Sequence, residues 1–248
     1  MFMATLNDPK LLRDCVDCVA SLIDEGLFKL TPSGIELTAA DRAMVAVLEM
    51  KLNKEAFESY QCDAPVSAGL NMQNFLTILK RAGSDDKLTL RLDGNRLEVI
   101  LDGNSRRVFE IPVLDVNVDD IPPVNNLTWT ATAELRADIL SQGIDDADII
   151  ADAVALEMSS EGFRMTSEGD SNKTELKLAA GNAALTNLDV KSPAKSKYPL
   201  EYLKSLTKAS RIADTATLAL STDYPARIEF KGANASIAMV LAPRVSEE

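Results

Sequence analysis

The sequence predicts an α+β protein made of two like-folded domains in tandem. Residues 30–40 (LTPSGIELTAA) and 158–168 (MSSEGFRMTSE) each read as two apolar strands joined by a glycine turn, and their first positions lie 128 residues apart. The alternating strand at 88–92 returns at 216–220 with the same spacing. A correspondence that spans so much of the chain indicates an internal duplication.

A helix recurs in the same repeat. Residues 75–82 (FLTILKRA) parallel residues 202–209 (YLKSLTKA) at a spacing of 127, and an alternating strand follows each of them. Apolar residues at helical spacing predict four helices in all, and segments of alternating polarity predict the strands. The expected helices cover residues 10–23, 72–82, 137–147 and 200–209.

The first domain is expected over residues 1–114. Its opening helix has Asp8 at the N-cap position and Pro9 in the first turn, with apolar residues along one face. Turn residues such as Asp93-Gly94-Asn95 separate the strands that follow. The expected strands are 27–30, 35–39, 44–52, 66–70, 87–92, 96–101 and 107–113, with a short helix or turn at 54–60.

A linker over residues 115–127 and a second domain over 128–248 complete the predicted organisation. The linker has paired prolines among Val, Asp and Asn residues, which is typical of extended surface chain. The second domain repeats the strand and helix pattern of the first. Its expected strands are 127–133, 148–158, 162–167, 174–180, 184–191, 216–221, 226–231 and 235–241.

Composition and charge limit the classes of function. With 46% hydrophobic but only 5% aromatic residues, the chain is predicted to fold around aliphatic cores. The net charge of −12 argues against tight binding of nucleic acid by the whole surface, although it is compatible with a local basic surface. Acidity of this size is also a common solubility feature.

The N-terminal residues, the length of the apolar stretches and the number of cysteines together predict a soluble, cytoplasmic protein with no membrane partner. The N-terminal residues MFMATLND show no basic region followed by an apolar run, and no stretch approaches the ~18 apolar residues of a membrane span. The number of cysteines is three, which is odd and argues against a disulfide framework.

Few residues are candidates for catalysis. The chain has no histidine, and it shows neither a glycine-rich phosphate loop nor a nucleophile elbow. Cys15 and Cys18 form a Cys-x-x-Cys pair, but both fall on the apolar face of the first helix, where buried small side chains are expected. The sequence therefore predicts a protein that is not an enzyme and has no cofactor or metal.

Two alternatives stay open at this stage. The acidic run Asp145, Asp146 and Asp148, with Asp152 nearby, could belong to a magnesium-dependent nuclease, but the pattern favours a solvated helix end, because it lacks the Gly and terminal Glu of a calcium loop. The other alternative is an adaptor protein that binds short peptides in a surface groove and does not assemble into a ring of subunits.

Basic residues gather on three of the four expected helices. Lys204, Lys208 and Arg211 follow i, i+4, i+7 spacing, Lys80 and Arg81 end the corresponding helix, and Lys10 and Arg13 lie on the first helix. On an acidic protein this pattern suggests one shared basic surface, with ordinary polar faces as the simpler reading.

Five short motifs are spread along the whole chain. They are Ala40-Asp41 with Met44-Val45, residues 57–60 (FESY), residues 78–83 (ILKRAG), Tyr202-Leu203 with Thr207-Lys208-Ala209, and residues 241–248 (LAPRVSEE). Together these motifs resemble one family, the sliding clamps of the proliferating cell nuclear antigen type, in their archaeal form. The last motif resembles the C-terminal signature of these clamps.

The resemblance implies a homotrimeric ring, with helices lining the hole, antiparallel sheets outside and double-stranded DNA threaded through the centre without sequence specificity. Strands 107–114 and 174–180 are expected at domain edges, where they would pair between subunits. The expected DNA-facing residues are Lys10, Arg13, Lys80, Arg81, Arg136, Lys204, Lys208 and Arg211. The third helix is expected to be less basic, because Asp138, Asp145 and Asp146 follow Arg136.

The resemblance also implies a groove for short partner peptides. Its expected residues are Ala40, Met44, Val45, Val118, Ile121, Pro122, Val124, Pro225, Val240, Leu241, Ala242, Pro243 and Val245. Val240 stands where some relatives place an aromatic ring. The implied users are the replicative DNA polymerase, the clamp loader, flap endonuclease and DNA ligase, in replication and repair on chromosomal DNA of an archaeal cell, or in the nucleus of a eukaryotic one.

Overall fold

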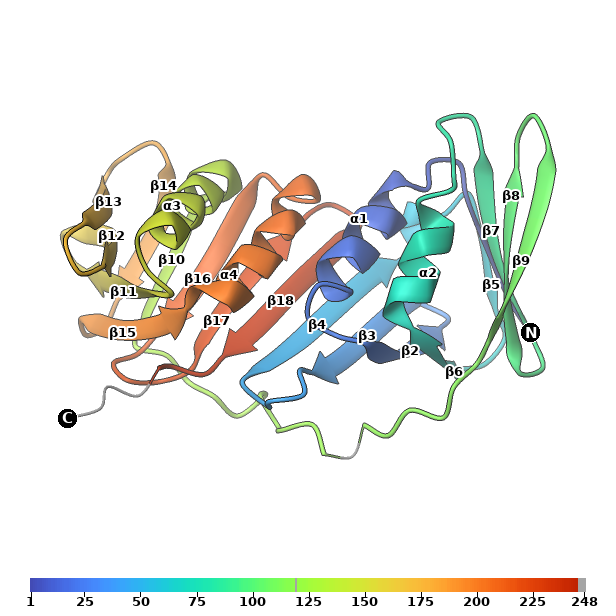
Figure 1. Ribbon diagram of the computed structural model, residues 1–248, viewed down its shortest axis with the longest axis horizontal. Coiled ribbons are helices and arrows are strands. Elements are labelled where there is room, and N and C mark those ends of the chain that lie inside the picture. The colour runs from blue at the N-terminus through green and yellow to red at the C-terminus, as the bar shows by residue number, and fades with distance from the viewer. Residues whose placement is uncertain (119, 245–248) are drawn as a thin grey trace. The chain divides into compact units, whose positions relative to one another are not determined.

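The computed structural model describes residues 1–118 and 120–244, and these fall into two compact units. One unit contains Met1–Arg42, Leu48–Ile121 and Ala233–Ile237. The other contains Ala43–Val47, Pro122–Gly232 and the described residues from Ala238 onward. Figure 1 shows two helices side by side against strands in each unit.

The first unit is built from two helices and antiparallel strands. Its five-stranded sheet has the order β5-β1-β7-β8-β9, and β4, β3, β2 and β6 are neighbours in that order in another sheet. The elements are β1 (Phe2–Leu6), α1 (Lys10–Val19), β2 (Glu25–Thr31), β3 (Gly34–Ala40), most of β4 (Ala46–Asn53), the 3-10 turn η1 (Lys54–Ala56), β5 (Ser59–Cys62), β6 (Val66–Asn71), α2 (Met72–Leu79), β7 (Lys87–Asp93), β8 (Arg96–Asp102) and β9 (Arg106–Pro112).

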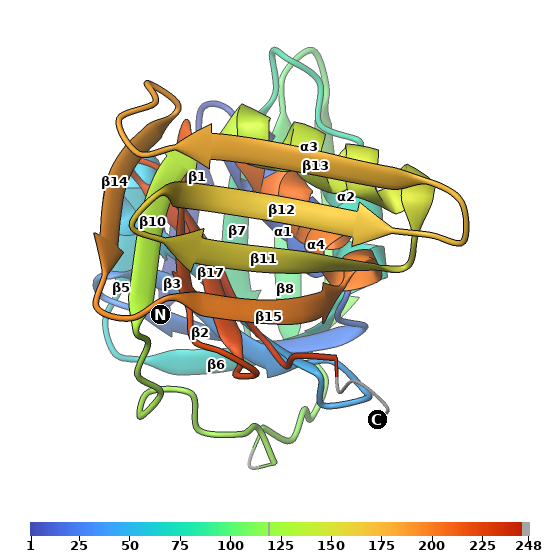
Figure 2. The same cartoon turned by 90° about the vertical axis from the view of Figure 1, so that its left-hand side faces the viewer.

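The second unit has the same composition. A four-stranded sheet with the order β13-β12-β11-β15 is seen face-on in Figure 2, and β14, β10, β16, β17 and β18 follow one another in a further sheet. The elements are β10 (Ala131–Arg136), α3 (Ala137–Ile150), β11 (Ala153–Ser159), β12 (Gly162–Glu168), β13 (Lys173–Ala179), β14 (Leu185–Val190), β15 (Ala194–Pro199), α4 (Leu200–Leu206), the 3-10 helix η2 (Thr207–Arg211), β16 (Thr215–Leu220), β17 (Ala226–Lys231) and most of β18 (Ala235–Leu241).

Burial of one face orients each helix. Leu12, Cys15 and Val16 of α1 are buried, and Phe75 of α2 packs edge-on against Phe28 of β2 with ring centroids 5.8 Å apart. The buried cysteines therefore act as small core residues, as the spacing predicts. In the second unit α3 buries Leu140, Ile144 and Ala147, while α4 buries Leu200, Leu203 and Leu206. The opposite faces of the helices carry mainly polar and charged residues, with Ile149 of α3 as an exposed apolar exception.

Two glycines 128 residues apart show the duplication in three dimensions. Gly34 and Gly162 have φ angles of 148° and 141°, and each opens a strand after a tight turn. A Cβ atom at these positions would overlap the carbonyl oxygens of Leu52 and Leu178, respectively. Both copies therefore need glycine for the same two reasons, the backbone angle and the close approach of a neighbouring strand.

The structure confirms the α+β class with antiparallel sheets and corrects several element boundaries. Strand 44–52 begins only at Ala46, because Met44 has a φ of 55° that interrupts extended chain. Strand 148–158 begins at Ala153, because α3 continues to Ile150. Strand 127–133 begins at Ala131, and none of the described residues in 115–130 lies in a helix or strand.

The ends of three helices also differ from the sequence prediction. The α-helices end at Val19, Leu79 and Leu206 rather than at residues 23, 82 and 209. Each ends in shorter-range turns, such as the bond from the Ser21 amide to the Cys18 carbonyl at 3.3 Å. The domain boundaries 1–114, 115–127 and 128–248 stay predictions.

Strands β9 and β13 are the end strands of their sheets in the described chain. β9 pairs with β8 and β13 pairs with β12, so one edge of each carries backbone groups not used in these ladders. Their side chains alternate between exposed positions and positions that are half-buried or, at Ile111 and Leu178, buried, and Val108 on β9 has 49% of its surface exposed. Edges of this length can accept a strand from another chain.

Candidate functional site

The polar faces of α1 and α2 carry four of the expected DNA-facing cations. Lys10 and Arg13 lie one turn apart on α1, while Lys80 and Arg81 follow the end of α2. Lys80 Nζ lies 3.3 Å from a carboxylate oxygen of Asp17, so this cation is paired across the two helices. Among the described residues, no ion pair involves Lys10, Arg13 or Arg81.

The second unit carries the other four cations, of which Arg136 and Lys204 form ion pairs with carboxylates of α3. Arg136 at the N-cap of α3 pairs with Asp138 two residues on. Lys204 on α4 pairs with Asp148 on α3, and this hydrogen bond, with a contribution from the charge of Asp145, raises the pKa of Lys204. Both helices thus present a mixture of charges rather than a uniformly basic face.

Lys208 and Arg211 do not continue the α-helix of Lys204. They lie in η2, the 3-10 helix that follows α4, so the expected i, i+4, i+7 stripe is not one straight helical face. The third helix is as acidic as its sequence suggests. Asp138, Asp145 and Asp146 are all exposed on α3, which has no basic residue in its last turn.

The acidic run does not assemble a metal site. Asp148 pairs with Lys204 and Asp152 pairs with Arg244. In the part of the chain that the structure describes, no three Asp, Glu or Cys side chains are placed to hold a metal ion. None of the described helices has the length and hydropathy needed to cross a membrane.

The expected partner groove falls partly in each unit. Ala40, Val118 and Ile121 belong to the first unit, while Pro122, Val124 and the remaining described members belong to the second. Within the second unit, the amide of Ala242 donates to the Val45 carbonyl at 2.9 Å, which brings two distant stretches of sequence together. Val245 lies outside the described residues.

The expected groove residues differ in how far their side chains are exposed, and only exposed ones can contact a ligand. Val240 and Leu241 are buried in β18. Met44 is half exposed, and Pro243 and Ala242 are partly exposed beyond the end of the strand. The indole nitrogen of Trp129 donates a hydrogen bond of 2.7 Å to the carbonyl of Pro225, which holds the backbone of Pro225 in place.

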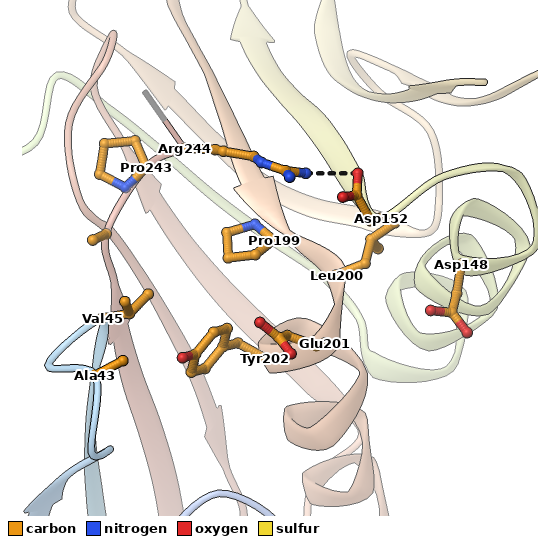
Figure 3. Close-up of a pocket in the computed structure, with 11 residues that line it drawn as sticks. Ala43, Val45, Asp148, Asp152, Pro199, Leu200, Glu201, Tyr202, Pro243 and Arg244 are labelled. Carbon is orange, nitrogen blue, oxygen red and sulfur yellow. Dashed lines mark ion pairs between the residues drawn. The ribbon is translucent and has the colours of Figure 1, made fainter. Parts of the chain in front are cut away.

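A cavity of about 600 Å³ lies within the second unit at this place (Figure 3). It includes three of the expected groove residues, Val45, Ala242 and Pro243. Its other lining residues, which sequence reasoning did not assign, are Ala43, Asp148, Asp152, Pro199, Leu200, Glu201, Tyr202 and Arg244. Half of these additions come from the junction of β15 with α4, where Pro199 immediately precedes the helix.

An ion pair forms one side of this cavity. Arg244 Nη1 lies 2.6 Å from Asp152 Oδ1, and Figure 3 shows the pair reaching from the C-terminal segment to the loop after α3. The hydrogen bond from Arg244 holds the pKa of Asp152 below its usual value. The Arg244 amide also donates to the Lys197 carbonyl at 2.7 Å, so the C-terminal segment is attached to β15 as well.

Comparison with known proteins identifies the family. The model of the N-terminal domain of proliferating cell nuclear antigen matches residues 1–121, and the model of its C-terminal domain matches residues 123–245. The chain belongs to the proliferating cell nuclear antigen family. Together the two matches cover nearly the whole sequence, so both halves of the duplication carry the family pattern.

Individual members of the proliferating cell nuclear antigen family agree with this result. The chain is 32% identical over 248 residues to the DNA polymerase sliding clamp of Thermococcus gammatolerans, with 99% of both chains covered. It is 28% identical over 250 residues to the DNA polymerase sliding clamp of Methanothermobacter thermautotrophicus, with 100% of both covered. The crystal structure of the antigen from Thermococcus kodakaraensis matches with a TM-score of 0.90 at 25% identity, over 98% of this chain and 100% of the other.

Proposed function

We propose that this chain is a DNA polymerase sliding clamp that encircles duplex DNA as a homotrimeric ring. The observation that carries the proposal is the match of both halves to the clamp family over nearly the whole chain, with a fold that agrees at a TM-score of 0.90. The curated relatives of the same length are themselves named DNA polymerase sliding clamps. A nuclease and a ring-free adaptor have no comparable support.

The clamp acts without bond chemistry. A ring that is topologically linked to DNA keeps a bound polymerase near the primer end, which raises its effective concentration without a tight DNA contact. Lysines and arginines that face phosphates add a weak attraction independent of sequence, and such attraction permits sliding. The residues proposed for this role are Lys10, Arg13, Lys80, Arg81, Arg136, Lys204, Lys208 and Arg211.

The ring is proposed to close through β9 of one subunit and β13 of the next. Each is an end strand of its sheet, and a head-to-tail contact between two different edges closes into a ring when the rotation fits. Three subunits of two domains would place six like-folded domains around the DNA.

Partner proteins are proposed to dock by short motifs in the groove that includes Val45, Ala242 and Pro243. The cavity there combines apolar side chains with a polar rim, which suits a short peptide helix with an aromatic anchor. The proposed users, in replication and repair in an archaeal cell, are the polymerase, the clamp loader, flap endonuclease and DNA ligase.

The proposal is tested by two measurements on the same preparation. Light scattering should give three times the chain mass of 26.8 kDa. The trimer should then lengthen the products of an archaeal replicative polymerase on primed DNA when a clamp loader is present. A monodisperse monomer at micromolar concentration, or a trimer without effect on product length, would refute the assignment.

A further inference from the structure

The helix cations divide into two groups by their surroundings. Lys80, Arg136 and Lys204 each form an ion pair with a carboxylate of the same unit. By contrast, no ion pair in the described chain involves Lys10, Arg13 or Arg81. If both groups face the same phosphates, they cannot contribute equally to the attraction.

In the first unit, the geometry makes the carboxylate the fixed partner. Asp17 has only 13% of its side chain exposed, whereas Lys80 has 56% exposed. The helices that carry them are joined nearby, since the side-chain amide of Gln73 on α2 donates to the Ala20 carbonyl at 2.6 Å. Lys80 can therefore rotate away from the pair while Asp17 remains in place.

The second unit repeats this arrangement between its own two helices. Asp148 on α3 has 32% of its side chain exposed and Lys204 on α4 has 54% exposed. Asp145, one turn before Asp148 on α3, also acts on Lys204 electrostatically. The repeat spacing does not relate the two pairs, because Lys204 corresponds to Thr77 rather than to Lys80. Different positions of the duplicated chain thus have the same charge arrangement.

We propose that Asp17 and Asp148 limit the attraction of the clamp for DNA by holding Lys80 and Lys204 in ion pairs between helices. This inference rests on the proposed function, since it assumes that these helices face duplex DNA. A phosphate that approaches Lys80 or Lys204 competes with a carboxylate already in contact, and the carboxylate itself repels the phosphate. The net contribution of each paired lysine is therefore smaller than that of Lys10 or Arg13.

The consequence is a clamp that slides with low friction in spite of its many cations. Each phosphate contact that releases a counterion adds about 0.9 to the slope of log affinity against log salt. A carboxylate beside the cation lowers the number of counterions released. Asp17 and Asp148 would thus act as positioning residues, setting the affinity for DNA without touching it.

The test measures binding of the full-length chain to a short fluorescent duplex by anisotropy over a series of salt concentrations. The variant Asp17→Asn/Asp148→Asn should bind about fivefold more tightly at low salt, because two surface pairs of ordinary strength no longer compete. Its salt dependence should also be steeper than that of the wild type. Equal affinity and slope in variant and control would overturn the proposal.

The control is Glu36→Gln/Glu58→Gln. These substitutions raise the net charge by the same two units, but they break ion pairs with Lys51 and Lys87 outside the four helices. A gain of affinity in the control as large as that in the Asp variant would mean that net charge alone explains the effect, and would overturn the proposal.

A comparison of two lysine and arginine variants tests the proposal even if the Asp variant fails to assemble. Lys10→Ala/Arg13→Ala should weaken DNA binding more than Lys80→Ala/Lys204→Ala does. The reverse order would contradict the inference while leaving the proposed function intact. If neither pair of substitutions weakens binding, the DNA-facing assignment itself is wrong and the inference falls with it.

Discussion

The ammonium nitrogen of Lys80 lies 3.3 Å from a carboxylate oxygen of Asp17, so the end of α2 is joined to α1 by an ion pair. More than half of the Lys80 side chain is exposed, whereas Phe75 of α2 and Leu12 of α1 are fully buried. Apolar burial of this kind outweighs a surface ion pair in its contribution to stability. The pair is therefore expected to affect the surface charge more than the fold.

Asp17→Asn should accordingly lower the free energy of unfolding by less than ~1 kcal/mol at low salt, and by less still at high salt. Urea denaturation followed by circular dichroism measures this. A loss of several kcal/mol would show instead that Asp17 holds the two helices together.

The turn glycine of the second unit makes a sharper prediction for stability. Gly162→Ala should cost about 2 kcal/mol or more, because the φ of 141° is unfavourable and the new Cβ meets the Leu178 carbonyl. Gly94→Ala is the matched control, since Gly94 has a φ of 57° with no atom near its Cβ position, and it should cost only about 1 kcal/mol. Equal losses in the two variants would refute the argument from close approach.

Acid sensitivity is predicted for the pair of Arg164 and Glu157. Arg164 donates to both carboxylate oxygens at 2.9 Å, and this holds the pKa of Glu157 below its usual value. Such a group stabilises the fold above its unfolded pKa of about 4.3, and the stabilisation is lost as the pH falls through the folded pKa. The stability difference between wild type and Glu157→Gln should therefore shrink between about pH 6 and about pH 3. Urea titrations over this range would contradict the argument if the difference stayed constant or grew.

Removing four cations together tests the surface proposed to face DNA. Alanine at Lys80, Arg81, Lys204 and Lys208 should reduce loading and processive synthesis, because attraction to phosphates is removed. The trimer should stay intact, because the ion pairs of Lys80 and Lys204 that are lost lie within one subunit and none of the four residues belongs to β9 or β13. Primer extension over a range of salt concentrations measures the effect, and light scattering monitors the ring. Unaltered stimulation of the polymerase at every salt concentration would show that these residues lie elsewhere.

The proposed partner groove is tested by truncating two of the residues that are expected to line it. Ile121→Ala with Pro243→Ala should abolish binding of a peptide with the pattern Gln-x-x-aliphatic-x-x-aromatic-aromatic, since loss of an anchor pocket costs ~2 kcal/mol or more. Calorimetry gives the dissociation constant directly. Leu241 is unsuitable for this test because it is fully buried, so its truncation would disturb the core. An unchanged dissociation constant would place the partner site elsewhere.

The sequence predicts the class and the duplication because both depend on local pattern. Gly34 and Gly162 are each followed by an apolar residue and a strand of alternating polarity, and the structure gives them similar φ angles of 148° and 141°. Sequence reasoning missed β1, β5 and β15, which are strands of four to six residues. In β15 the buried positions are Ala194, Ser196 and Tyr198, so the strand lacks the apolar alternation that would reveal it.

The candidate site was predictable only in part, because local sequence pattern does not reveal which distant residues meet in the fold. Helical spacing in the sequence is enough to place Lys10, Arg13 and Lys204 on polar faces of α1 and α4. The partners of the cations could not be recognised in this way, because Asp17 and Lys80 are 63 residues apart and meet only after the helices pack. Likewise, Pro199 and Tyr202 join Pro243 at the cavity through the folding of β15 and α4, which no local pattern encodes.

Encirclement is the central claim, and release from circular DNA tests it most directly. The fluorescently labelled chain is loaded by a clamp loader onto a nicked circular duplex, and retention is measured at high salt before and after the circle is cut once. A clamp held by topology remains on the circle despite the salt and slides off the ends after cutting. Retention that is lost at high salt on the intact circle, or that is unaffected by cutting, would contradict the account.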